Sequence, residues 1–128
     1  MHILISNKSG VPIYEQIELQ ISELIMKGEL KEGDVLPSIR QLARDLRISV
    51  ITTARAYSEL EGKGFLAAMQ GKGYYVLSGN SAAVKEQYLQ KVSEHLENAV
   101  KDAKTAGIPQ TKLIEILKGM FKEENEND

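Results

Sequence analysis

Apolar residues recur every three to four positions along most of the chain, the spacing of one helix face. The pattern predicts helices at about 13–27, 39–46, 50–62, 82–106 and 110–122. Ile17, Ile21 and Ile25 form such a stripe in the first, which Pro12 can begin and Gly28 can end. The periodicity breaks at "FLAAM" and "YYVL", two apolar runs around a glycine turn, which predicts a β-hairpin. The run 3–5 is too brief to classify and leaves a small edge strand open.

The order helix, short helix, tight turn, helix, hairpin is that of a winged helix-turn-helix. Ser38 and Ser49 stand where N-caps of the second and third helices are expected. Four β-branched residues, 50–53, open the third helix although they are poor helix formers, which indicates a role for this end besides helix stability. We therefore expect a mostly α fold with a small β-hairpin (α+β). A winged helix-turn-helix spans 11–78, and a two-helix C-terminal region spans 79–128.

The tripeptide Gly-Lys-Gly occurs twice, at 62–64 and 71–73. We expect Gly62 and Gly64 to close the third helix, because glycine accepts the left-handed conformation of a helix end. Gly71 and Gly73 fall at the hairpin tip, where Lys72 would project. Neither copy fits the nucleotide-binding pattern GxxxxGK[ST], so we expect no nucleoside triphosphate site.

Charge is unevenly distributed in a chain of 128 residues with a net charge of −2. Residues 36–78 carry six basic and three acidic side chains, whereas 81–128 carry seven basic and nine acidic ones. A weakly basic module before an acidic end favours an anionic partner for the middle of the chain.

Other classes of function have little support. There is no cysteine, and His2 and His95 have no ligand-spaced partner, so we expect no disulfide, metal or cofactor. No catalytic Ser-His-Asp order or carboxylate pair stands out, so we expect no enzyme. The start lacks the features of a signal peptide and no apolar run is long enough to span a membrane, so we expect a cytoplasmic protein.

The stretch "LPSIRQLARDLRISVITTARAYSELEGKGFL" with the later "QGKGYYV" closely resembles the GntR family of bacterial transcription regulators, as does the upstream "PIYEQI". The resemblance covers about 11–77. It implies a DNA-binding regulator with the third helix in a major groove. The two helices after residue 78 resemble the YtrA-like branch, which implies a homodimer, usually without an effector domain, that often represses nearby transporter genes.

Site residues follow from the resemblance one at a time. Ser38 and Arg40 are expected near the DNA backbone, Arg40 alternatively at a guanine. The start of the third helix, where base edges are reached, supplies Ser49, Ile51 and Thr52, and Arg55 follows one turn later. Gly71 and Lys72 form the wing tip, with the lysine on phosphate. Many members have arginine, which commonly reads guanine, where this chain has Val50, and a valine side chain cannot hydrogen-bond to a base.

We expect dimerisation through the apolar stripe of the long helix and the last helix. The residues are Val84, Tyr88, Val92, Leu96, Ala99, Leu113, Leu117 and Phe121. The operator would then be an imperfect palindrome, with half-sites ~34 Å apart.

Several alternatives stay open. A winged-helix adaptor that binds proteins would also fit the fold. Arg44 and Arg47 fit a solvated face as well as a DNA contact, and Tyr57 fits the core better than a base contact. A small-molecule effector between the C-terminal helices is a third reading, although the apolar residues there suit a core.

Overall fold

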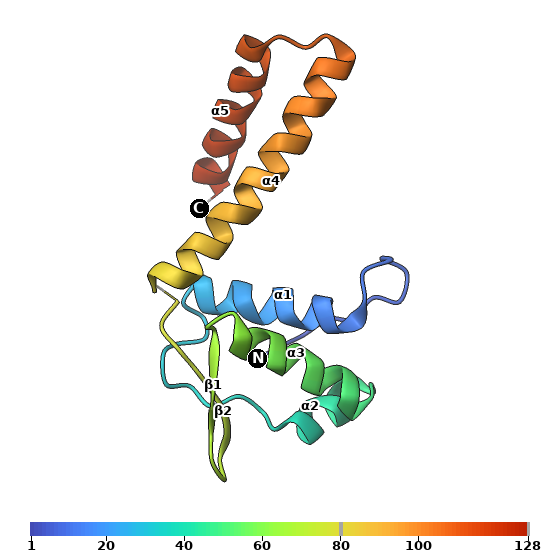
Figure 1. The fold of residues 1–128 in the computed structure, drawn as a ribbon, viewed down its shortest axis with the longest axis vertical. Helices are drawn as coiled ribbons and strands as arrows, with labels where there is room; N and C mark the ends of the chain where they lie inside the picture. The colour runs from blue at the N-terminus through green and yellow to red at the C-terminus, as the bar shows by residue number, and fades with distance from the viewer. Residues whose placement is uncertain (80, 128) are drawn as a thin grey trace. The chain divides into compact units, whose positions relative to one another are not determined.

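The computed structural model describes residues 1–79 and 81–127, with side chains up to 123. The helices are α1 (Ile13–Met26), α2 (Ile39–Leu46), α3 (Val50–Gly62), α4 (Ala82–Ala106) and α5 (Gln110–Asn127). Strands β1 (Leu66–Met69) and β2 (Gly73–Val76) form one antiparallel sheet (Figure 1). The expected fold class and element order are confirmed. The chain divides within α4 into an N-terminal unit, 1–87, and a C-terminal unit, 88–128.

The core of the N-terminal unit lies where α1 packs against α3. Ile17, Ile21 and Ile25 of α1 are buried at intervals of four, as their spacing predicts. Thr53, Ala56, Tyr57 and Leu60 form the buried face of α3, and Leu42 and Ala43 form that of α2. Figure 1 shows α1 and α3 lying side by side, with α2 beside the start of α3.

The segment before α1 is held by glutamine side chains rather than by a strand. Gln20 accepts from the backbone N–H of Leu4 through Oε1 (2.9 Å) and donates to its C=O through Nε2 (2.7 Å). Gln16 binds the backbone N–H and C=O of Ser6 in the same way. Residues 1–12 therefore contain no strand, and the apolar run contributes only Ile3 to the core.

The wing is wider than the predicted hairpin. Leu66 pairs with Val76 and Met69 with Gly73, which closes the expected two strands. The stretch before α2, expected to be a loop, also joins β2 through an antiparallel bridge between Val35 and Tyr75. The backbone N–H of Leu36 donates to Tyr74 O, 2.9 Å away. The segment that leads into α2 is thus fixed to the wing.

The two Gly-Lys-Gly copies do different work, as predicted, with one correction. Gly64 has φ +87° just after the C-cap Lys63, so it supplies the left-handed residue past α3. Gly62, expected to share that task, is the last residue of the helix and has no positive φ. At the tip, Lys72 N donates to Met69 O (2.9 Å) and Gly71 has φ +78°, the turn geometry that glycine favours.

The C-terminal unit is a helical hairpin. The turn has Gly107 at φ +70°, and Ile108 N donates to Ala103 O (2.8 Å), an ordinary glycine helix end. Helices α1, α2, α3 and α4 match their predicted bounds to within one residue. Helix α5 continues to Asn127, whereas the sequence predicted an end near residue 122.

Candidate nucleic-acid interface

Two capped helix starts lie at the helix-turn-helix. Ser38 Oγ accepts from Gln41 N and Ser49 Oγ accepts from Thr52 N, each at 3.0 Å. Both N-cap predictions are therefore confirmed. Ser49 Oγ also donates to Thr52 Oγ1 at 2.8 Å, which leaves the Thr52 hydroxyl hydrogen available to a ligand. A capped helix start presents backbone N–H groups and a positive dipole end, features that suit an anion.

The turn between α2 and α3 depends on a non-glycine residue in the left-handed conformation. Arg47, the C-cap of α2, has φ +57° and ψ +47°. Ile48 N then donates back to Ala43 O at 3.0 Å, which closes the turn. No glycine or asparagine marks this position, so sequence reasoning expected only a break and not its conformation.

The first turn of α3 projects apolar side chains outward. Ile51 is 81% exposed and Val50 is also exposed, whereas Thr53 on the opposite side is fully buried. Ser49 and Arg40 are exposed as well, and Thr52 is half-buried. The β-branched residues at this helix start are therefore divided between the core and a free outer face.

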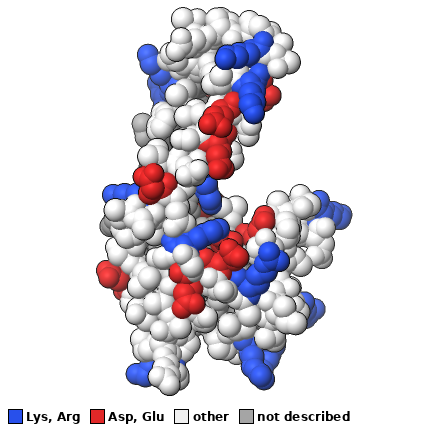
Figure 2. Space-filling view, in the orientation of Figure 1, with Lys and Arg blue, Asp and Glu red and all other residues white. Residues whose placement is uncertain are grey.

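The wing tip presents Gly71 and Lys72, both exposed. The wing is anchored to α3, because the Tyr57 and Tyr74 rings meet edge to face with centroids 5.2 Å apart. Tyr57 is fully buried and its hydroxyl donates to Pro37 O (2.7 Å), which confirms its assignment to the core. Figure 2 shows basic side chains along the lower edge of the N-terminal unit, at the hairpin tip and beside it.

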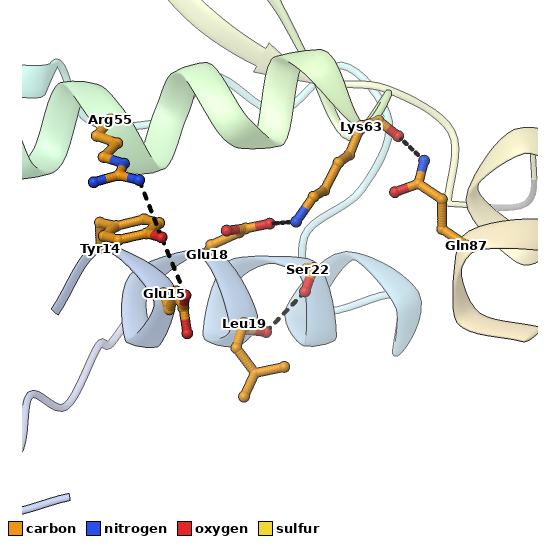
Figure 3. Close-up of polar contacts among 8 residues, drawn as sticks. All are labelled: Tyr14, Glu15, Glu18, Leu19, Ser22, Arg55, Lys63 and Gln87. Atoms are coloured by element: carbon orange, nitrogen blue, oxygen red, sulfur yellow. Dashed lines mark hydrogen bonds and ion pairs between the residues drawn. The ribbon is translucent and has the colours of Figure 1, made fainter. Parts of the chain in front are cut away.

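Arg55 is exposed, and its side chain contacts helix α1. Its guanidinium carbon lies 3.8 Å from the ring centroid of Tyr14 in α1, and Nη2 donates to the Tyr14 hydroxyl at 3.2 Å (Figure 3). Sequence reasoning missed Tyr14, because nothing in the pattern shows that positions 41 residues apart share one face.

Comparisons with known proteins match this geometry. The family of bacterial regulatory proteins called GntR matches residues 13–76. The HTH-type transcriptional repressor YtrA of Bacillus subtilis is 38% identical over 91% of this chain and 89% of its own length. The chain belongs to the GntR family.

Two solved structures extend the comparison. One described as a transcriptional antiterminator from Listeria monocytogenes is 28% identical over 94% of this chain and 90% of that one, with a TM-score of 0.75. The DNA-binding domain of AraR in complex with operator ORX1 is 25% identical over 59% of this chain and 95% of that one, with a TM-score of 0.53. This GntR-family chain thus has the winged-helix DNA-binding domain of transcriptional regulators, and its resemblance to YtrA is confirmed. Such relatives are regulators rather than enzymes.

Not every basic residue of this GntR-family domain is available to DNA. Lys63, counted above in the basic stretch, forms an ion pair with Glu18 of α1. Its backbone C=O accepts from Gln87 Nε2 in α4 (Figure 3). Lys63 therefore connects three helices within the N-terminal unit.

The residues expected at a dimer interface have different environments. Val84 is fully buried within the N-terminal unit. Tyr88, Ala99 and Leu113 are half-buried, whereas Val92, Leu96, Leu117 and Phe121 are exposed. Leu96, Ala99, Leu113 and Leu117 line an apolar groove of about 280 Å³ between α4 and α5.

Metal binding and membrane insertion have no candidate in the part of the chain that the structure describes. No group of three or more His, Asp or Glu side chains there could hold a metal ion. None of the helices within 1–79 and 81–127 is both long and apolar enough to cross a membrane.

Proposed function

We propose that this GntR-family regulator is a homodimeric repressor that reads a palindromic operator through α3 and the wing. The observation that carries the proposal is the outer face of the first turn of α3. Ile51 is 81% exposed there, beside Thr52, whose hydroxyl accepts from Ser49 and can itself donate to a base edge. An exposed isoleucine at a capped helix start suits contact with a thymine methyl group in the major groove.

The backbone contacts would come from flanking elements. Arg40 lies in the first turn of α2, next to the N-terminus that Ser38 caps. Lys72 extends from the wing tip, which Tyr57 and Tyr74 hold in place. Together they would fix the register of α3 in the groove without reading sequence. Valine at position 50 cannot hydrogen-bond, so readout at that point would rely on apolar contact.

Dimerisation is supported by apolar surface that the C-terminal unit leaves uncovered. Leu96 is 46% exposed and Phe121 is 65% exposed, and they belong to a larger apolar set on α4 and α5. A helical hairpin with such a surface is expected to bury it against a second copy. Two copies would place two α3 helices for two half-sites, the usual arrangement of dimeric helix-turn-helix proteins.

The resemblance to the YtrA-like branch extends the proposal to the target. We propose repression of an operon that includes the protein's own gene and a transporter, in the cytoplasm of a bacterium. A reporter fused to the upstream region would be more active without the protein than with it if the sign is repression.

Binding of labelled DNA, followed by fluorescence anisotropy, tests the proposal. The wild-type protein should bind a duplex from its own upstream region more tightly than a scrambled duplex, with log affinity falling linearly in log salt. Arg40→Ala should weaken binding to both duplexes and reduce the salt slope by about one, as expected for a lost phosphate contact. A protein adaptor, the alternative, would bind both duplexes equally weakly, and the substitution would leave its partner binding unchanged.

A further inference from the structure

A tyrosine outside the helix-turn-helix holds an arginine of the recognition helix. Tyr14 lies in the first turn of α1 and Arg55 in the second turn of α3. The guanidinium carbon is 3.8 Å from the Tyr14 ring centroid, and Nη2 donates to the Tyr14 hydroxyl (Figure 3). Stacking and a hydrogen bond together restrict a side chain that is otherwise flexible.

The hydrogen bonds of Tyr14 leave most of the Arg55 guanidinium accessible. The Tyr14 hydroxyl donates to Glu15 Oε1 at 3.1 Å while it accepts from Arg55. The hydrogen bond to Glu15 raises the pKa of Tyr14, so the ring stays neutral at physiological pH. Among the described residues no carboxylate forms an ion pair with Arg55. Four of the five guanidinium N–H donors remain for another acceptor.

The position of Arg55 on α3 suggests what that acceptor is. Arg55 follows Ile51 by four residues, so both lie on one exposed face of the helix. When the first turn of a recognition helix reaches base edges, the next turn on that face approaches the DNA backbone at the edge of the groove. A guanidinium with a free donor edge is suited to bidentate contact with a phosphate.

We infer that Tyr14 is a positioning residue that holds Arg55 ready for a DNA phosphate. This inference rests on the proposed function. The physical reason is preorganisation, since an arginine already ordered against a ring loses less conformational freedom when it binds. Tyr14 itself does not read a base, so its effect is the same for every DNA sequence.

The test is a double-mutant cycle of Tyr14→Leu and Arg55→Met, measured by anisotropy on the upstream and scrambled duplexes across a salt series. Arg55→Met should weaken binding to both duplexes and reduce the salt slope by about one. Tyr14→Leu should weaken both by about two- to tenfold while it keeps the slope, because the charge remains. The double variant should bind as Arg55→Met does. Tyr14→Phe, which keeps the ring, should retain most of the affinity.

Two outcomes would overturn the inference. One is a double variant in which the losses of affinity of the two single variants multiply, because Tyr14 would then act independently of Arg55. The other is a Tyr14→Phe variant as weak as Tyr14→Leu. Should Tyr14→Leu unfold, Tyr14→Gln replaces it in the cycle: its loss of affinity must then be smaller in the Arg55→Met background than in the wild type. Failure of the wild type to prefer the upstream duplex would instead count against the proposed function.

Discussion

The turn of the helix-turn-helix is closed by one strained residue. Arg47 is the only non-glycine residue with positive φ in the described part of the chain. A side chain with a Cβ destabilises the left-handed conformation by roughly 1–2 kcal/mol, a cost that glycine avoids. The Arg47 side chain is exposed, so the strain at this position is not offset by side-chain packing.

Replacing Arg47 separates its backbone strain from its side chain. Arg47→Gly should raise the free energy of unfolding by about 0.5–1 kcal/mol. Glycine removes the backbone strain of the folded state, but it also raises the conformational entropy of the unfolded chain, which offsets part of the gain. Arg47→Ala, the matched control, also lacks the guanidinium but keeps a Cβ, so its stability should stay close to that of the wild type. Urea unfolding measures both. A glycine variant no more stable than the alanine variant would contradict the argument.

The role of a single residue could be predicted from the sequence only where its partners lie within the next helical turn. The caps Ser38 and Ser49 follow from a side chain and its own next turn, so their sequence context was enough. The contact of Tyr14 with Arg55 joins two helices, and no periodicity within either helix reveals it. The left-handed Arg47 was missed for a third reason, since arginine carries no turn signal.

At the scale of elements, the recognition helix and the wing are tied through Tyr57. Its hydroxyl donates to Pro37 O in the segment that the bridge at Val35 attaches to β2. Helices and hairpin were predictable because period, caps and glycines are local signals. The extra pairing of the segment before α2 was not, because it is set by packing against a wing 40 residues later in the chain.

The free energy of unfolding at alkaline pH should depend on the buried Tyr57 hydroxyl. Burial raises the pKa of Tyr57 above its ordinary value of 10.0, so the folded state keeps a proton that the unfolded state releases. Its contribution is therefore complete below pH 10 and is lost as the pH rises further. Tyr57→Phe should cost about 1 kcal/mol at neutral pH. From pH 10 to pH 11 the free energy of unfolding of the wild type should fall by about 1 kcal/mol more than that of Tyr57→Phe.

Urea unfolding of both proteins between pH 8 and 11 would measure the difference. All other ionisable groups are common to both proteins, so their contributions cancel in the comparison. Parallel pH profiles would show that the Tyr57 hydroxyl ionises as readily in the folded state as in the unfolded one.

For the whole molecule, the start of α4 belongs with the DNA-binding unit. Val84 is fully buried there, and Gln87 donates to the C-cap carbonyl of α3. Deleting everything after Ser78 would remove both contacts, and a fully buried valine alone contributes about 1.5–3 kcal/mol. We therefore propose 1–87, in place of 1–78, as the fragment that isolates the DNA-binding unit.

Comparing fragments with the full chain tests the proposed dimer. The 1–87 fragment should melt cooperatively and sediment as a monomer, and 1–78 should melt at a lower temperature. Full-length protein should sediment as a dimer through its exposed α4 and α5 surface. The monomeric 1–87 fragment can occupy only one half-site at a time. It should therefore bind the palindrome about a hundredfold or more weakly than the dimer, whose two linked DNA-binding units raise each other's effective concentration. A dimeric 1–87 fragment would move the interface into the winged helix, and a monomeric full chain would leave the apolar groove to another occupant.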